Sequence, residues 1–262
     1  MEIKAADVAK LRAMTGAGMM DCKKALVEAE GDFDRAQDII REKGKLVAAK
    51  RADRTATQGV VASKIVGQKG YMLCLACETD FVAQNADFVA ATNAILDIAV
   101  EADAADLDAL LAVVKDGKTV AEIVTEKSGQ TGEKVELAYY GKIEAPMCVT
   151  YIHMNSKLGT LIGFNKEIDK EVAKDVAAMA PVSIDKGDCD PKIIEHERMI
   201  GREQARQEGK PEAMLDKIAE GKVNKFLKEN TLLNQDLVKN NKISVGTYIK
   251  EADKDATVIA YK

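Results

Sequence analysis

Apolar residues recur at helical spacing through residues 5–43, and glycines interrupt the pattern at Gly16, Gly31 and Gly44. This spacing predicts three short helices, with Asp32 as the N-cap of the third helix and Gly44 as its end. A bundle of about forty residues lies near the lower size limit for independent folding. We therefore expect a docking module at the N-terminus rather than a site of chemistry.

A pattern of two strands followed by a helix occurs twice further along the chain. The two copies cover, in the order strand, strand and helix, residues 60–66, 71–77 and 86–100, and then residues 148–154, 160–164 and 170–179. Further helical segments and a strand are expected within 105–142, and a last strand at 257–261. Two hairpin-plus-helix units predict an α+β protein whose core has two subdomains of similar topology.

Two long, highly charged helices are predicted at 191–208 and 212–228, on either side of Gly209-Lys210-Pro211. Glycine and proline between two helical patterns favour an antiparallel helical hairpin, and its narrow apolar stripe predicts that it projects from the body. The domains expected from these patterns are residues 1–54 (bundle and basic linker), 55–142 (first core subdomain) and 143–262 (second core subdomain, with the hairpin at about 191–228).

The composition narrows the class of protein. The chain has 262 residues, is 47% hydrophobic and 31% charged, and contains no tryptophan, so aliphatic side chains must build its core. A net charge of −5 argues against general nucleic-acid binding, and no apolar run reaches membrane-spanning length. The N-terminus lacks the pattern of a signal peptide, and the five cysteines form no disulfide framework. We therefore expect a cytoplasmic protein.

Residues 41–54 are basic, with a net charge of +4. Their alanine content predicts a helix. A solvated helical linker is the favoured interpretation, and contact with an acidic partner or RNA is the alternative.

The residues that could carry chemistry are few. Cys74 and Cys77 have the spacing of a redox pair or of half a zinc site, but residues three apart in a strand point to opposite faces. Buried structural cysteines are therefore favoured, and we expect no metal site. His153 and His196 are the only histidines, and a Cys77–His153 nucleophile pair is an enzymatic alternative for which no orienting residue is evident. Phosphate-binding glycine loops are absent, so we expect no direct nucleotide binding.

Thr79-Asp80-Phe81-Val82 places a large aromatic residue in a polar turn directly after an apolar strand. One interpretation is structural: Thr79 or Asp80 caps the next helix and Phe81 folds back as a hydrophobic staple. The other is functional: Phe81 is exposed and serves as an anchor that inserts into a partner. Residue types alone leave both open.

Two segments resemble signatures of the bacterial elongation factor Ts family. They are Thr15-Gly16-Ala17-Gly18-Met19-Met20-Asp21-Cys22-Lys23-Lys24-Ala25-Leu26 and Glu78-Thr79-Asp80-Phe81-Val82-Ala83, the latter followed by Asn85. Each is long enough to be specific, and their separation matches the family. After about residue 100 the resemblance rests on the order of helices and strands rather than on residue identity.

The resemblance implies a fold and a set of contacts. It implies an N-terminal three-helix bundle like a ubiquitin-associated (UBA) domain, two α+β core subdomains and a projecting helical hairpin. It further implies a guanine-nucleotide exchange factor that binds elongation factor Tu, mainly through the GTPase domain of that partner. Within Thr79–Val82, Asp80 and Phe81 would intrude near the partner's magnesium site, and Lys23 and His153 would make further contacts.

The implied mechanism follows from linkage, because a factor that prefers the nucleotide-free partner must weaken nucleotide binding by the same factor. The main alternative is a UBA-like protein-binding module without exchange activity, which would leave the Thr79–Val82 motif idle. The sequence is compatible with a one-to-one complex and with a dimer of such complexes.

Overall fold

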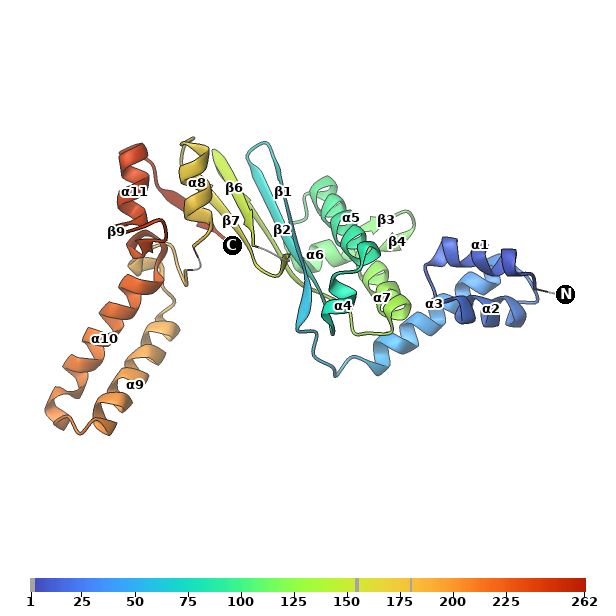
Figure 1. Ribbon diagram of the computed structural model, residues 1–262, viewed down its shortest axis with the longest axis horizontal. Coiled ribbons are helices and arrows are strands. Elements are labelled where there is room, and N and C mark those ends of the chain that lie inside the picture. The colour runs from blue at the N-terminus through green and yellow to red at the C-terminus, as the bar shows by residue number, and fades with distance from the viewer. Residues whose placement is uncertain (1–2, 154–155, 180) are drawn as a thin grey trace. The chain divides into compact units, whose positions relative to one another are not determined.

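The structure is a computed structural model that describes residues 3–153, 156–179 and 181–262 (Figure 1). Helices and small sheets alternate along the chain, which confirms the α+β class. The chain forms two compact units. The first comprises Met1–Lys64, Tyr71–Gly141 and Met154–Leu158, and the second comprises Ile65–Gly70, Lys142–His153 and Gly159–Lys262. Among the described residues, no helix is both long and apolar enough to cross a membrane.

The first unit begins with three helices, α1 (Ala5–Thr15), α2 (Met19–Glu28) and α3 (Phe33–Lys50). Gly16 ends α1 in the left-handed conformation (φ 69°), and the carboxylate of Asp32 accepts a hydrogen bond from the backbone N–H of Arg35, as the predicted N-cap of α3 should. Val8, Leu11 and Leu26 are buried between the helices. The three predicted helices are therefore present.

The predicted end of α3 at Gly44 is wrong, because the helix continues to Lys50. Gly44 is buried in the helix interior, where α3 crosses α7 (Val120–Thr131). A Cβ atom on Gly129 of α7 would lie only 2.5 Å from the Cα atom of Gly44. The glycines thus permit close packing of two helices, a demand that outweighs the low helix propensity of Gly44.

The first sheet contains β1 (Gln58–Val66), β2 (Lys69–Cys77) and β5 (Glu136–Glu144), in the order β1-β2-β5. The central strand β2 is buried along most of its length, and Leu73 and Leu75 share a core with Phe88 and Ile95 of α5 (Ala86–Ala102). The unit is completed by α4 (Asp80–Ala83), α6 (Leu107–Ala112), α7 and a two-stranded ladder of β3 (Val114–Lys115) and β4 (Lys118–Thr119).

The second unit contains β6 (Met147–Ile152), β7 (Gly159–Phe164) and β10 (Val258–Tyr261), in the antiparallel order β10-β7-β6. In both sheets the second strand of a hairpin is central and a later strand pairs with its other edge. The helices α8 (Lys170–Ala177) and α11 (Val245–Ala252) pack on this sheet around Phe164 and Ile249. A ladder of β8 (Asp236–Leu237) and β9 (Asn240–Ser244) precedes α11. The end of the expected strand 148–154 and the start of the turn after it lie outside the described residues.

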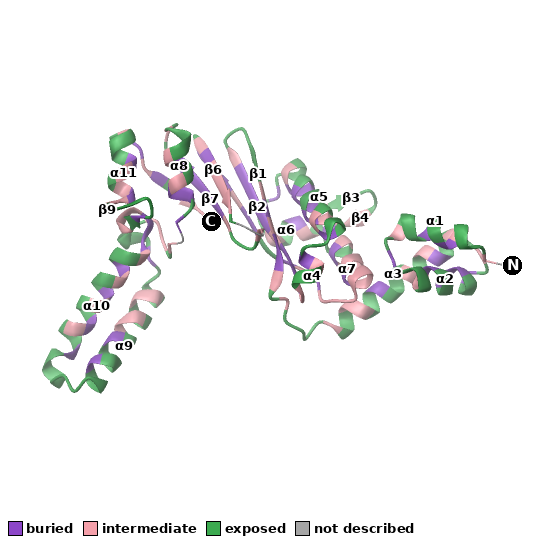
Figure 2. Cartoon of the chain, viewed as in Figure 1, coloured by how far each residue is buried: buried purple, intermediate pink, exposed green. Residues whose placement is uncertain are grey.

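The predicted helical hairpin consists of α9 (Pro191–Gln207) and α10 (Leu215–Asn230), which lie side by side in Figure 1. Ion pairs Arg198–Glu220, Arg202–Asp216 and Arg206–Glu212 run in opposite sequence directions, so the helices are antiparallel. Figure 2 shows mostly exposed residues on both helices, with a narrow buried seam between them. Short 3₁₀ helices occur at Lys186–Asp188, Glu212–Met214 and Leu232–Asn234.

Candidate partner-binding site at the turn after β2

Two helix caps in quick succession shape the chain after β2. The Thr79 hydroxyl accepts a hydrogen bond from the backbone N–H of Val82 at 3.4 Å and caps α4, which is four residues long. The Asn85 side chain then accepts from the N–H of Asp87 at 2.8 Å and caps α5. Each cap satisfies a backbone donor that a helix start leaves unpaired. The sequence therefore folds locally into a strand, a single helical turn and a long helix.

Phe81 is 84% exposed, whereas Phe88 at the start of α5 is 2% exposed and lies in the core. The capping half of the structural interpretation is confirmed only in part, because Thr79 caps the short α4, whereas Asn85 caps the helix predicted at 86–100. The other half is wrong, because Phe81 does not fold back. Val82 and Ala83 instead attach α4 to the core, while Asp80 and Phe81 both face solvent. The turn thus displays an aromatic ring beside a carboxylate.

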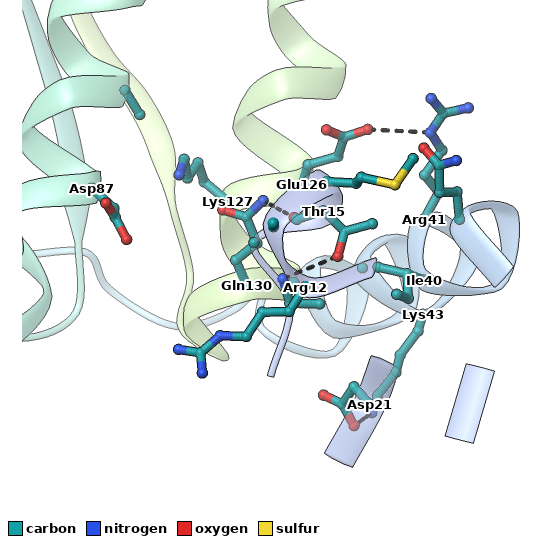
Figure 3. A pocket seen from close by; sticks show the side chains of 18 of the residues that line it. Arg12, Thr15, Asp21, Ile40, Arg41, Lys43, Asp87, Glu126, Lys127 and Gln130 are labelled. Carbon is teal, nitrogen blue, oxygen red and sulfur yellow. Dashed lines mark hydrogen bonds and ion pairs between the residues drawn. The ribbon is translucent and has the colours of Figure 1, made fainter. Parts of the chain in front are cut away.

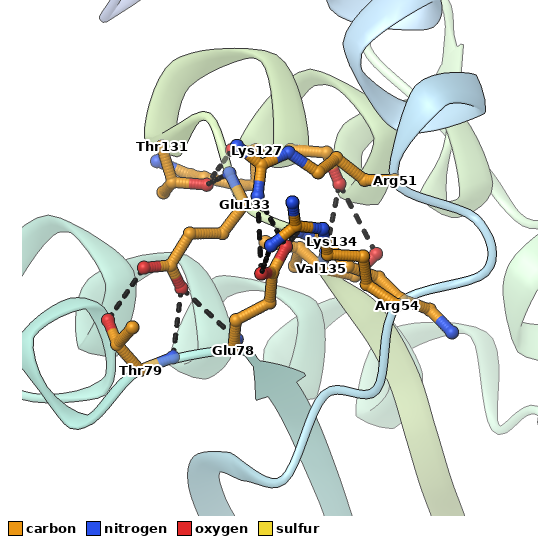
Figure 4. Close-up of polar contacts among 10 residues, drawn as sticks. Arg51, Arg54, Glu78, Thr79, Lys127, Thr131, Glu133, Lys134 and Val135 are labelled. Carbon is orange, nitrogen blue, oxygen red and sulfur yellow. Dashed lines mark hydrogen bonds and ion pairs between the residues drawn. The ribbon is translucent and has the colours of Figure 1, made fainter.

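Glu133, in the turn between α7 and β5, holds the start of this segment (Figure 4). Its Oε2 atom accepts hydrogen bonds from the backbone N–H groups of Glu78 at 3.1 Å and Thr79 at 3.0 Å. Its Oε1 atom accepts from the Thr79 hydroxyl at 2.6 Å. Hydrogen bonds to an ionised acceptor are stronger than those between neutral groups, so this carboxylate stabilises the start of the turn.

Glu78 makes the reciprocal contact. Its carboxylate accepts from the backbone N–H of Lys134 at 2.7 Å and forms ion pairs with Arg51 at 3.2 Å and Arg54 at 3.3 Å. The hydrogen bond from Lys134, and then the charge of the two arginines, hold the pKa of Glu78 below its ordinary value. The basic segment 41–54 is therefore more than a solvated linker, because its last arginines pair with Glu78, directly before the Thr79–Val82 motif.

Cys77 also makes a hydrogen bond to the start of this turn. Its thiol donates to the carbonyl oxygen of Thr79 at 3.2 Å, and burial, reinforced by the charge of Glu133, raises its pKa to about 11. Burial also raises the pKa of Cys74. A thiol that stays protonated at neutral pH is a poor nucleophile and a poor metal ligand. The local chemistry therefore argues against a redox pair, a zinc site and a Cys77–His153 nucleophile.

The remaining candidate residues lie elsewhere on the molecule. Lys23 is exposed on α2, in the first unit. His153 follows β6 in the second unit, where it is exposed and its Nδ1 atom lies 2.9 Å from the hydroxyl of Tyr151. His196 is exposed on α9. The structure thus gathers Thr79, Asp80, Phe81 and Val82 at one turn, and the roles of Lys23 and His153 stay predictions.

A cavity of about 860 Å³ in the first unit has no counterpart in the sequence prediction. It lies where α1 and α3 face α5 and α7, and Figure 3 shows side chains of α7 that reach toward the bundle. Gln130 donates to the carbonyl oxygen of Thr15 at 2.5 Å, and Glu126 pairs with Arg41 at 3.5 Å. These contacts attach the bundle to α7.

Sequence comparisons agree with the resemblance in the two signatures. A family model described as elongation factor TS matches residues 78–262, so the match starts at Glu78. An elongation factor Ts from Porphyromonas gingivalis is 45% identical, over 100% of this chain and 97% of the relative. One from Cytophaga hutchinsonii is 47% identical over 99% and 97%, and one from Bacteroides fragilis is 39% identical over 100% and 98%. The chain belongs to the elongation factor Ts family.

Proposed function

We infer that the chain is a guanine-nucleotide exchange factor that binds elongation factor Tu and promotes GDP release in translation elongation. The observation that carries the inference within the structure is the exposed Phe81 on a turn fixed by two caps and two carboxylates. Water gives no reason to display a phenyl ring, whereas a partner does.

The proposed mechanism uses binding alone. GDP is held largely through phosphate and magnesium contacts, so a side chain that disturbs those contacts weakens nucleotide binding. We assign Phe81 the role of a wedge. We assign Asp80 the role of competing for the groups that order the magnesium ion. A coupling of about 4 kcal/mol between factor and nucleotide weakens GDP binding about a thousandfold. No covalent bond is made or broken, so the factor is not an enzyme and needs no cofactor.

The rest of the chain supplies further binding in this proposal. The bundle within residues 1–54 acts as a UBA-like docking module through the face that carries Lys23, and His153 makes a separate contact from the second unit. The GTPase domain of elongation factor Tu is the main surface for both. We place the activity in the cytoplasm, in keeping with five free cysteines. A one-to-one complex and a dimer of complexes both satisfy the proposal.

The test is the release of fluorescent GDP from purified elongation factor Tu. The chain should accelerate release, and Phe81→Ala should reduce the acceleration. Val238→Ala is the matched control, because Val238 is 81% exposed in the second unit and its removal should leave the rate unchanged. A chain that binds elongation factor Tu without accelerating release would establish the binding-module alternative.

Magnesium tests the assignment to the ion site. In excess EDTA the partner releases GDP faster unaided, so the acceleration by the factor should be smaller than with magnesium present. The difference between the parent and Phe81→Ala should shrink in the same way. A difference of equal size under both conditions would assign the effect to contacts with the guanine base or the phosphate loop.

A further inference from the structure

The turn that carries Phe81 cannot hold its own conformation. The helix α4 has four residues, and a single helical turn is unstable unless something outside it fixes its first residues. The donors at its start, on Glu78 and Thr79, lie after the end of β2 and before the first turn of α4. Neither the sheet nor the helix supplies their acceptor, so the acceptor must come from elsewhere.

Glu133 is that acceptor, across a separation of 54 residues from Thr79. Within the described residues, the hydrogen bonds of its carboxylate all go to Glu78 or Thr79. The Thr79 hydroxyl donates its hydrogen to Glu133 and therefore presents a lone pair to the N–H of Val82. The carboxylate thus orients the cap of α4 as well as its backbone.

Glu133 is itself held in place. Gly132 ends α7 in the left-handed conformation (φ 71°), and the N–H of Glu133 donates to the Thr131 hydroxyl at 3.3 Å. The next N–H, of Lys134, donates to Glu78 at 2.7 Å. Residues 78–79 and 133–134 therefore exchange hydrogen bonds in both directions, as the two ends of a capping box do within one helix. Figure 4 shows Glu133, Glu78 and Thr79 facing one another.

We propose that Glu133 is a positioning residue for nucleotide exchange, which acts by fixing the α4 turn so that Phe81 meets the partner already oriented. The proposal rests on the exchange function proposed above. An anchor on a mobile turn must be ordered when it binds, and fixing it in advance removes that cost. Glu133 does this through its hydrogen bonds to Glu78 and Thr79, directly before Asp80 and the exposed Phe81.

The test compares Glu133→Gln with Glu136→Gln. The first keeps the size of the side chain but removes its charge and replaces one of its two acceptor oxygens with an amide N–H₂, which cannot accept a hydrogen bond. The second removes an equally charged carboxylate nearby, one that pairs with the Lys134 side chain rather than with the turn. We expect Glu133→Gln to slow GDP release from elongation factor Tu about tenfold at saturating factor, as the loss of a charge-assisted hydrogen bond would. Glu136→Gln should leave the rate unchanged.

The decisive measurement repeats Glu133→Gln in a Phe81→Ala background. If Glu133 acts through Phe81, its replacement should slow release by less than about twofold there, because coupled residues are non-additive. A structural role alone would give the same factor in both backgrounds, together with a lower melting temperature, and would overturn the proposal. So would parent-like exchange by folded Glu133→Gln.

Three further outcomes separate the two proposals. If Phe81→Ala alone exchanges like the parent, the assignment of Phe81 as the wedge fails, and the role of Glu133 fails with it. A normal loss in Phe81→Ala with no loss in Glu133→Gln overturns only the role of Glu133. If Glu133→Gln does not fold, Thr79→Val keeps the carboxylate and removes the hydroxyl that donates to Oε1 and caps α4, and its effect must show the same dependence on Phe81 or the proposal is overturned.

Discussion

The two sheets have the same strand order, yet the connections that follow their central strands differ in where they place a large apolar side chain. After β2, residues 78–85 contain the additional turn α4, and Phe81 faces solvent. After β7, residues 165–169 lead to α8 without such a turn, and their one large apolar side chain, Ile168, packs against the core of the second unit.

Each connection is held by polar contacts with a distant segment of its own unit. In the second unit, Asn165 donates to the carbonyl oxygen of Asp255 at 2.9 Å and accepts from the N–H of Thr257 at 2.8 Å. Lys166 pairs with Asp253 at 2.7 Å. In the first unit, Glu133 and Glu78 have the corresponding role. Rigidity is therefore common to both connections, and the exposed aromatic ring is what distinguishes them.

The comparison separates scaffold from function. A repeated strand-strand-helix arrangement sets where a connection begins and ends, and the residues inserted there decide what it can bind. A rigid connection that buries its apolar residue stabilises its own unit, whereas one that exposes it keeps that apolar surface for a partner.

The largest expected effect comes from truncating the two apolar residues. Phe81→Ala should reduce the acceleration of GDP release about 5- to 150-fold, the effect of losing an anchor worth about 1–3 kcal/mol, and should leave the melting temperature unchanged. Ile168→Ala should do the reverse, lowering the free energy of unfolding by about 1–2 kcal/mol because a half-buried side chain is lost, with normal exchange. Stopped-flow fluorescence and urea denaturation measure the two quantities.

Either variant can break the comparison. A lower melting temperature with normal exchange in Phe81→Ala would make Phe81 a structural residue despite its exposure. Slow exchange in a fully folded Ile168→Ala would show that the second connection also contacts the partner.

Sequence patterns predicted the elements that are long and periodic. The helix expected at 86–100 is α5 (Ala86–Ala102), and the hairpin expected around Gly209-Lys210-Pro211 is present. The apolar pattern predicts no element over residues 236–252, where the structure has β8, β9 and α11. These elements are two to eight residues long, too short for a period to stand out.

The site was predictable only as far as local chemistry reaches. The neighbours of Thr79 in the sequence are enough to predict that it caps a helix. The exposure of Phe81 depends on whether the core has space for its ring, and residue types alone do not determine that. Glu133 gave no signal, because its partners lie 54 and 55 residues away and nothing in its own segment calls for a carboxylate. Gly44 was misassigned for the same reason: its neighbour Gly129 lies on another helix.

A smaller effect is expected from the glycines that let helices approach in each unit. A Cβ atom on Gly129 would lie 2.5 Å from the backbone of α3, whereas one on Gly201 of α9 would lie 3.3 Å from the Cα atom of Ala219 on α10. Gly129→Ala should therefore lower the free energy of unfolding by about 1–3 kcal/mol, since backbone must move. Gly201→Ala should be close to neutral, because the gain in helix propensity offsets a contact that yields by a few tenths of an ångström.

Gly44→Ala is the control on the same crossing. Its Cβ atom would lie 3.6 Å from the Cα atom of Gly129, an ordinary contact, so the substitution should be neutral or stabilising. Urea denaturation orders the three variants. Helix propensity alone would make both Gly129→Ala and Gly44→Ala stabilising. Equal losses for the two variants would contradict the prediction, because only a Cβ atom on Gly129 lies too close to the facing backbone.

The smallest effect concerns the buried strand cysteines, Cys77 in the first unit and Cys148 in the second. The Cys148 thiol donates to the carbonyl oxygen of Gln68 at 3.1 Å, and burial raises its pKa as it raises that of Cys77. A pKa of about 11 for Cys77 leaves about one thiol in a thousand ionised at pH 8. Native protein should therefore resist alkylation by iodoacetamide at pH 8 at both positions, whereas urea-unfolded protein should react at once.

The same raised pKa fixes the direction of the pH dependence. Because the folded state keeps the Cys77 thiol protonated above its ordinary pKa of 9.0, its contribution to stability is complete below pH 9 and is lost as the pH rises toward 11. Cys77→Ser, whose hydroxyl can still donate to Thr79 and stays neutral in that range, should lose less melting temperature between pH 9 and pH 11 than the parent does. Its exchange rate at pH 7.5 should stay within about twofold of the parent, because the support of the turn is kept. Fast alkylation of native Cys77, or exchange that depends on added reductant, would contradict this prediction. Either result would support the interpretation of Cys74 and Cys77 as a redox pair.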